Sequence, residues 1–390
     1  MAKKIKNPNL LTLKESREII KNNLREMKRL EKIKREKRTP DQFTTVMKNK
    51  DNVVEIEDLE TYFYTDNGVV RSVNKISFDV PRDSIVGLVG ESGCGKSVTS
   101  LSIMQLVQAP QGQVVGGQIR FNTDELSENE NGEKLAYDVT KMPTLDMCRI
   151  RGKDISMIFQ EPMTSLNPVF TVGFQIEEVF YLNNPEATKE EARAKAIEML
   201  SLVGIPMPET IVDYYPHQLS GGMRQRVMIA ISLTGNPKLI IADEPTTALD
   251  VTIQSQILNL LKKVQKDSGA SIMLITHDLG VVAEMADYVV VMYAGKIVEK
   301  GTVYEIFDNP MHPYTIGIQK AKPSLASDAE EELYSIPGNV PNPINIPDEC
   351  LFKGRCNRKC GKCEGKTYPK EIKITETHSV FCHLYDEEGE

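Results

Sequence analysis

The sequence predicts an α/β protein built around a parallel β-sheet. Three short stretches support that prediction, because residues 84–89, 239–242 and 271–276 are nearly unbroken apolar runs. Strands that are apolar on both faces are typical of parallel sheets covered by helices on each side. Amphipathic stretches separate the runs, and one of them, residues 188–203, begins with Thr188 and Glu191 at capping-box spacing. Strands that alternate with helices indicate crossover connections and therefore an α/β fold.

The composition is that of a globular protein. The chain has 390 residues, of which 40% are hydrophobic and 26% charged, and its formal net charge is −8. No apolar run reaches the ~18 residues of a membrane-spanning helix. The N-terminus has no apolar signal segment, so we expect neither a pore-forming chain nor a secreted one. The composition also excludes collagenous, coiled-coil and wholly disordered chains. The charge is uneven, because residues 1–50 carry +10 and the others −18.

Residues 1–50 are predicted to form a basic, helical N-terminal extension. Thr12 and Glu15 have capping-box spacing, and Pro40 ends the helical pattern. A rough apolar stripe follows helical spacing at Ile20, Leu24, Met27 and Leu30. Such a segment lies on an anionic membrane surface, docks on a partner, or stays solvated as a tail. The sequence leaves these alternatives open.

The rest of the chain divides into three parts by composition. Residues 53–320 carry the alternating strand and helix pattern, and the polar, acidic residues 122–149 within them are expected to form an inserted surface loop. Residues 321–349 are rich in proline and predict a stiff, extended linker. Residues 350–390 hold five of the seven cysteines and predict a small Cys-rich C-terminal extension.

A glycine-rich loop follows the first buried run. Residues 90–97 fit the pattern G-x-x-x-x-G-K-[ST]. The glycines let backbone N–H groups surround phosphate oxygens, Lys96 reaches the β- and γ-phosphates, and Ser97 offers a hydroxyl to Mg²⁺. The following helix points its positive end at the anion. The loop predicts a nucleoside triphosphate site made of Gly90, Glu91, Ser92, Gly93, Cys94, Gly95, Lys96, Ser97 and Val98.

Two carboxylates follow the second buried run. Asp243 and Glu244 come at the C-terminal end of a predicted strand, where ligands bind in open α/β sheets. Asp243 is placed to hold Mg²⁺, and Glu244 is placed to polarise an attacking water. An apolar run followed by Asp-Glu is common, so the interpretation depends on the phosphate loop nearby.

The segment Leu219-Ser220-Gly221-Gly222-Met223-Arg224-Gln225-Arg226 resembles the signature of ATP-binding cassette (ABC) proteins. The resemblance implies a P-loop NTPase cassette that binds ATP and Mg²⁺, with a parallel-sheet core, an antiparallel β subdomain and a helical subdomain at about residues 161–235. It also implies that the signature completes the ATP site of a partner cassette, because its helix N-terminus faces the γ-phosphate there. The signature residues are Leu219, Ser220, Gly221, Gly222 and Gln225.

Other motifs of the ABC family follow in the family's order. Gln160 resembles the Q-loop glutamine, which also contacts Mg²⁺, Asp250 the D-loop aspartate, and His277 the switch histidine that contacts the γ-phosphate. Phe63 aligns with the aromatic residue that stacks on adenine, although a tyrosine flanks it on each side. The resemblance implies hydrolysis with Glu244 as the base. The catalytic residues it implies are Glu244, His277, Gln160 and Lys96.

Stretches outside these motifs resemble importers of oligopeptides, dipeptides and nickel. They are residues 157–168, 278–284 and 309–315, and the similarity runs from about 53 to 385. It implies the ATPase subunit of an oligopeptide importer, with dipeptides or nickel as alternative cargo. A non-transport ABC ATPase and a degenerate ATP-binding scaffold are less expected.

The importer resemblance also implies partners and a location. The partners are a second, different ABC ATPase subunit, two transmembrane permease subunits and an extracellular peptide-binding protein. The location is the cytoplasmic face of the cell membrane, as a peripheral protein. No nucleic-acid partner is expected.

The cysteines of the tail are dense for a cytosolic chain, in which thiolate clusters usually hold metal. The importer ATPases carry a similar tail, and some of them bind a [4Fe-4S] cluster there. Cys350, Cys356, Cys363 and Cys382 match the family spacing, whereas Cys360 is additional. Four thiolates suit either an iron–sulfur cluster or Zn²⁺. A cluster, zinc and no metal therefore remain open, and we expect a structural role for the tail.

Overall fold

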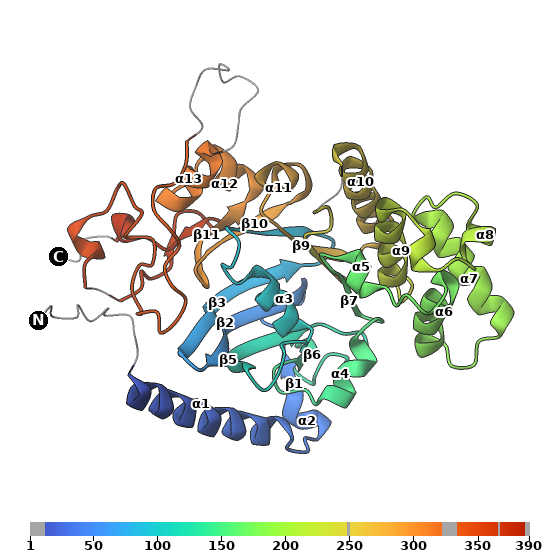
Figure 1. The fold of residues 1–390 in the computed structure, drawn as a ribbon, viewed down its shortest axis with the longest axis horizontal. Coiled ribbons are helices and arrows are strands. Elements are labelled where there is room, and N and C mark those ends of the chain that lie inside the picture. The colour runs from blue at the N-terminus through green and yellow to red at the C-terminus, as the bar shows by residue number, and fades with distance from the viewer. Residues whose placement is uncertain (1–11, 248–249, 322–333, 366, 387–390) are drawn as a thin grey trace, which may run out of the picture.

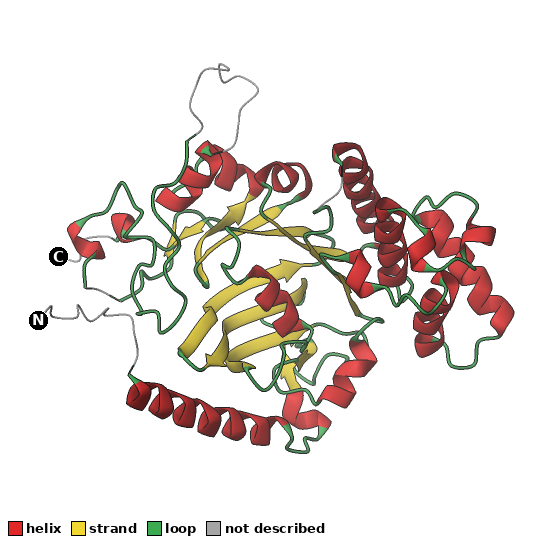
Figure 2. Ribbon diagram, in the orientation of Figure 1, coloured by secondary structure: helices red, strands yellow, loops and turns green. Residues whose placement is uncertain are grey.

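The computed structural model describes residues 12–247, 250–321, 334–365 and 367–386. Two β-sheets lie at the centre, with helices around them (Figures 1 and 2). Ala248 and Leu249 of the predicted D-loop, and residues 322–333 of the predicted linker, lie outside the described residues. No helix within the described ranges is both long and apolar enough to cross a membrane.

The larger sheet confirms the predicted parallel core. Its strand order is β12-β13-β11-β10-β4-β9-β8-β7, and the five strands from β10 to β7 are parallel. The three apolar runs are β4, β8 and β9, and every residue in them is buried. The strands are β4 (Ile85–Val89), β7 (Ile155–Ile158), β8 (Leu239–Asp243), β9 (Ser271–Thr276), β10 (Tyr288–Tyr293), β11 (Lys296–Thr302), β12 (Ile372–Lys373) and β13 (Ser379–Val380).

The smaller sheet is antiparallel, with the order β1-β6-β5-β2-β3. Its strands are β1 (Thr44–Val46), β2 (Asn52–Thr65), β3 (Gly68–Pro81), β5 (Gly112–Phe121) and β6 (Leu135–Asp138). The prediction of a surface loop over 122–149 is wrong, because this segment contains β6 and most of helix α4 (Thr144–Ile150). β6 joins the sheet between β5 and β1, and Ala136 and Asp138 are buried there.

The two sheets share an apolar core, and helix α3 (Lys96–Ile103) contacts both of them. Ile76 of β3, Leu88 of β4 and Ile103 of α3 are fully buried in it. A second core joins the far face of the larger sheet to the helices at the right of Figure 1. These helices are α5 (Pro162–Ser165), α6 (Val172–Asn183), α7 (Lys189–Leu202), α8 (Pro208–Ile211), α9 (Gly221–Leu233) and α10 (Val251–Ser268), with the 3₁₀ turn η1 (Pro216–Gln218).

Helix α1 (Leu13–Lys34), followed by the short α2 (Pro40–Phe43), runs along the antiparallel sheet (Figure 1). Thr12 and Glu15 form the capping box that their spacing predicts. The helix contacts β2, β3 and β5. Asn23, which is buried, donates from Nδ2 to the carbonyl of Thr65 at 2.8 Å. α1 therefore docks on its own chain; Leu30 of its apolar stripe is buried there, whereas Leu24 is 49% exposed.

The C-terminal part of the chain packs on the larger sheet. Helices α11 (Leu279–Met285), α12 (Val303–Asp308) and α13 (Pro313–Lys320) precede it, and it contains the 3₁₀ turns η2 (Gly361–Cys363) and η3 (His383–Tyr385). β13 extends the sheet by pairing with β11. A third core contains Tyr293, Tyr314, Cys350 and Phe352. The segment after α13 also reaches β3, where the N–H of Asn345 donates to the carbonyl of Val69.

Candidate nucleotide site

The phosphate loop connects β4 to α3, as the sequence predicts. Gly90 has φ 154° and Gly95 has φ 105°, values that side chains disfavour. An added Cβ would lie 2.2 Å from the carbonyl oxygen of Met292 at Gly90, and 2.2 Å from that of Ser72 at Gly95. Only glycine fits at these two positions, because both the backbone angle and the space exclude a side chain.

Lys96 stands at the first residue of α3 and is 5% exposed. Its Nζ donates to the carbonyl of Gly90 at 2.8 Å and to that of Glu91 at 3.1 Å. The ammonium group thus lies inside the loop, where the loop's own carbonyls hold it. Cys94 is buried beside it, and burial raises the pKa of this thiol, which fits a packing role.

Asp243 ends β8, and the hydroxyl of Ser97 donates to its Oδ1 at 3.0 Å. Burial raises the pKa of Asp243, and the neighbouring Glu244 carboxylate adds to this effect. A hydroxyl beside a carboxylate at the end of a strand supplies the hard oxygen ligands that Mg²⁺ prefers. These residues fit the predicted magnesium ligands.

The Glu244 carboxylate contacts three neighbouring polar side chains. Its Oε2 accepts from Nε2 of Gln160 and from the hydroxyl of Thr247, each at 2.9 Å. Its Oε1 lies 3.2 Å from Nδ1 of His277. Burial acts to raise the pKa of Glu244, but the hydrogen bonds with Thr247 and His277 outweigh it, so the pKa lies below its usual value. The structure thus brings Gln160 and His277 together on the predicted base, which is ionised at neutral pH.

Five of the predicted site residues, Lys96, Ser97, Gln160, Glu244 and His277, line one cavity of about 620 Å³. Its lining contains Ser72 and residues 91–93 and 95–98, together with Gln160, Glu244 and His277. Sequence reasoning missed Ser72 and Thr247. Thr247 lies three residues after Glu244, and this closeness in sequence was the signal available. Ser72 carries no such signal, because only the packing of β3 against the loop places it there.

Phe63 does not line the phosphate cavity. It is half-buried in β2, and its ring lies against Gly112 and close to Val107, where an added Cβ on Gly112 would meet both side chains. The adenine role that the alignment implies for Phe63 therefore stays a prediction.

The signature residues lie away from the cavity. Ser220 caps α9, and its hydroxyl accepts from the N–H of Met223 at 3.3 Å. Ser220 and Gly221 are exposed, and the cavity lining given above includes no signature residue. Gln225 is buried and donates to the carbonyl of Pro245 at 2.7 Å, which ties α9 to the residue after Glu244. Asp250 caps α10 and accepts from the N–H of Ile253.

The cysteine tail does not form a ligand set. Within the described residues, no group of three or more His, Cys, Asp or Glu side chains is arranged to hold a metal ion. Cys360 and Cys363 have their sulfur atoms 3.6 Å apart. Burial raises the pKa of Cys350 and Cys356, and it raises that of Cys382 to about 12, so these thiols are protonated. Of the three alternatives that the sequence left open, the iron–sulfur cluster and zinc are not supported, and the residues as arranged do not fit either metal.

A phosphate loop on a buried parallel strand, with a glutamate in contact with a glutamine and a histidine beside it, is the arrangement of an ABC ATPase cassette. The family model for ABC transporters matches residues 73–247, and the model for the C-terminal region of oligopeptide/dipeptide transporters matches residues 298–363. The chain belongs to the family of oligopeptide and dipeptide transport ATP-binding proteins of ABC transporters. It is an ATP-hydrolysing enzyme of that class.

Three relatives from Bacillus subtilis (strain 168) illustrate the similarity. The oligopeptide transport ATP-binding protein AppD is 47% identical over 86% of this chain and 98% of its own. The oligopeptide transport ATP-binding protein OppD is 48% identical over 84% of this chain and 87% of its own. The dipeptide transport ATP-binding protein DppD is 45% identical over 87% of this chain and 97% of its own.

Solved structures show the same fold. A dimeric structure of the ATP-binding cassette MJ0796, in a post-hydrolysis state bound to ADP and Pi, is 25% identical with a TM-score of 0.54, covering 64% of this chain and 98% of that one. The cbiO1 structure from Clostridium perfringens is 27% identical with a TM-score of 0.52, covering 66% and 92%.

Proposed function

We propose that this chain is the ATPase subunit of a membrane importer for oligopeptides. The observation that carries the proposal is the convergence of Gln160, Thr247 and His277 on Glu244, beside Lys96 in the phosphate loop. The names of the relatives support peptides as the cargo, with dipeptides as the alternative.

The residues divide the chemistry among them. Lys96 exchanges its contacts with the loop carbonyls for phosphate oxygens when ATP binds. Ser97 and Asp243, with Gln160, would hold Mg²⁺, which would supply positive charge against the phosphates. Glu244 orients the attacking water and accepts its proton. His277, whose Nδ1 lies 3.2 Å from Oε1 of Glu244, contacts the γ-phosphate in this proposal.

A second ABC ATPase subunit completes the site in this proposal. Ser220 and Gly221 present the exposed N-terminus of α9 away from the chain's own phosphate cavity. Backbone N–H groups at a helix N-terminus bind anions. We therefore assign the signature to the γ-phosphate of ATP held by a partner cassette, and we infer a partner of different sequence.

The permease subunits are expected on the helical side. Four apolar side chains of or near α6 are strongly exposed, and they are Val169, Phe170, Phe174 and Leu182. Two of them, Phe174 and Leu182, line a cavity of about 690 Å³ between α6 and α7, whose lining also includes Glu177, Glu178 and Arg193. Apolar surface with a charged rim is typical of a protein interface. An extracellular peptide-binding protein would deliver cargo to the permeases.

The importer would work at the cytoplasmic face of the membrane, and α1 adds a contact with it. The exposed side chains of α1 offer positive charge to an anionic surface. Lys14, Lys21 and Lys28 are exposed at seven-residue spacing, so they share a face. Each lysine near an anionic leaflet contributes about 1 kcal/mol to binding.

Replacing Glu244 by Gln tests the proposal. The variant keeps the shape of the site but removes the base, so steady-state phosphate release should fall by about a hundredfold or more. MgATP binding should persist, and the variant should retain ATP in a complex with its partner cassette. Glu284→Gln is the matched control, because Glu284 is an exposed residue of α11 outside the cavity. Unchanged hydrolysis in Glu244→Gln would refute the assignment.

A further inference from the structure

Glu91 is an acidic residue inside a loop that binds polyphosphate. It lines the phosphate cavity and also a second cavity of about 520 Å³, which Arg355 lines as well. A carboxylate near bound phosphates repels them, because like charges at short range interact unfavourably. The loop must therefore hold this side chain away from the phosphates or neutralise its charge.

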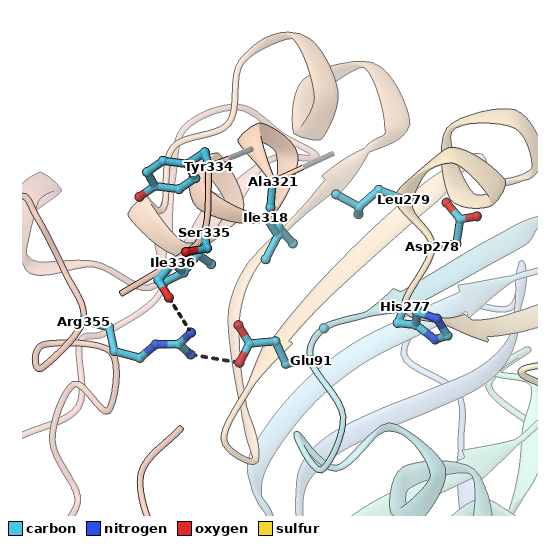
Figure 3. A pocket seen from close by; sticks show the side chains of 11 residues that line it. Glu91, His277, Asp278, Leu279, Ile318, Ala321, Tyr334, Ser335, Ile336 and Arg355 are labelled. Carbon is cyan, nitrogen blue, oxygen red and sulfur yellow. Dashed lines mark hydrogen bonds and ion pairs between the residues drawn. The ribbon is translucent and has the colours of Figure 1, made fainter. Parts of the chain in front are cut away.

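Arg355 does both. One of its terminal nitrogens, Nη1, donates to Oε2 of Glu91 at 2.8 Å. Figure 3 shows the carboxylate of Glu91 turned toward Arg355 and away from His277. The Arg355 side chain is only 9% exposed. Its Nε donates to the carbonyl of Pro337 at 3.1 Å, and its guanidinium lies 5.8 Å from the ring centroid of Tyr293. These contacts fix the guanidinium, so the pair is an anchored one rather than a loose surface ion pair.

Tyr314 holds the backbone of the same residue. Its hydroxyl accepts a hydrogen bond from the N–H of Glu91 at 2.8 Å. The tyrosine is fully buried in α13, with its ring 4.8 Å from that of Tyr293 and 5.5 Å from that of Phe352. Arg355 and Tyr314 both lie in residues 298–363, the range that matches the C-terminal region of oligopeptide/dipeptide transporters. The C-terminal region thus holds both the side chain and the backbone of Glu91 by hydrogen bonds.

We propose that Arg355 is a positioning residue for ATP, which draws the Glu91 carboxylate out of the phosphate site and neutralises it, with Tyr314 fixing the backbone beside it. The inference rests on the proposed assignment of the phosphate loop to ATP. The C-terminal region then does more than extend the fold, because the affinity of the phosphate loop depends on it. Without Arg355, the Glu91 charge would turn toward the nucleotide, and ATP binding would weaken by repulsion.

The test compares Arg355→Met with Glu91→Gln and with the double variant, in the full chain. For Arg355→Met we expect an approximately tenfold increase in Kd for MgATP by calorimetry, and the same increase in KM with kcat changed by less than about threefold. In the Glu91→Gln background, Arg355→Met should change Kd by less than about twofold, because no unpaired charge remains. Arg355→Lys should restore part of the affinity, and raising the salt concentration should narrow the gap between wild type and Arg355→Met.

Arg358→Met is the matched control, because Arg358 is exposed in the same region. Urea midpoints separate a folding defect from the charge effect. Two results would overturn the inference: an unchanged Kd in Arg355→Met, or an equal loss of affinity in both Glu91 backgrounds. Binding needs no turnover, so a wild-type chain that binds MgATP without hydrolysing it would count against the proposed function alone.

Discussion

Glu299 joins the C-terminal tail to the start of α13, and replacing it by Gln should loosen both. The side chain is fully buried in β11. Its carboxylate accepts from the N–H of Met311 at 2.7 Å and that of His312 at 2.9 Å, and it lies 2.8 Å from Nε2 of His378. Glutamine has the same shape but offers one oxygen, so its NH₂ group must face a donor. One lost hydrogen bond to a charged acceptor costs about 1.5–3 kcal/mol, which is roughly a 10- to 150-fold change in the opening equilibrium.

Native-state hydrogen exchange of the amides in β12, in β13 and at Met311 and His312 measures this opening. The matched control is Glu371→Gln. Glu371 pairs with Lys300 at 3.0 Å but is 34% exposed, and such pairs contribute about 0–1 kcal/mol. We expect exchange to accelerate at least about tenfold in Glu299→Gln and less than about fivefold in the control. An equal acceleration of amide exchange, relative to wild type, in Glu299→Gln and Glu371→Gln would refute the reasoning.

Two further predictions concern the tail and α1. The first concerns Glu305. Burial acts to raise the pKa of this carboxyl, but hydrogen bonds from Thr375 and the Thr302 cap, among others, lower it from the ordinary 4.5 to about 2. Its stabilisation is therefore complete above pH 4.5 and lost as the pH falls toward 2. Because Glu305 is partly exposed, Glu305→Gln should lower the free energy of unfolding by only about 1 kcal/mol at neutral pH. Urea unfolding should show that the difference in the free energy of unfolding between wild type and Glu305→Gln shrinks below pH 4.5. A difference that does not change with pH would contradict the assignment. Replacing Lys14, Lys21 and Lys28 together by Gln should weaken binding of the full chain to phosphatidylserine vesicles at least about tenfold at low salt. Binding is measured by sedimentation with the vesicles, and neutral vesicles are the control. Unchanged binding of the triple variant would exclude α1 as a membrane contact.

The parts of the site that local sequence determines were predictable. The phosphate loop needs glycine at Gly90 and Gly95 for reasons of backbone angle, and Asp243 follows a run that only a buried strand explains. The assignment of Gln160 and His277 followed from the order of the family motifs, but their contact with Glu244, across 84 and 33 residues of sequence, is seen only in the structure. The phosphate loop and the strand-end carboxylates were predictable because they depend on residue types at short, fixed spacing.

The parts that depend on packing between distant segments were not predictable from one sequence. Glu91 and Arg355 are 264 residues apart, and neither carries a local signal for the other. β6 was missed because its four residues sit in an acidic segment, and only pairing with β5 and β1 makes them a strand. The docking of α1 was left open, because an apolar stripe predicts that one face of a helix is covered but does not identify the surface that covers it.

The order of the strands also sets the order in which the protein can fold during its synthesis. β2, β3 and β5 are close in sequence, so the antiparallel sheet can form early. β4, which leads into the phosphate loop, must wait for β9 and β10, and these are made only with residues 271–276 and 288–293. Until then its edges are unpaired and open to wrong partners. Since β12 and β13 come from residues 372–380, the large sheet becomes complete only after these residues have left the ribosome.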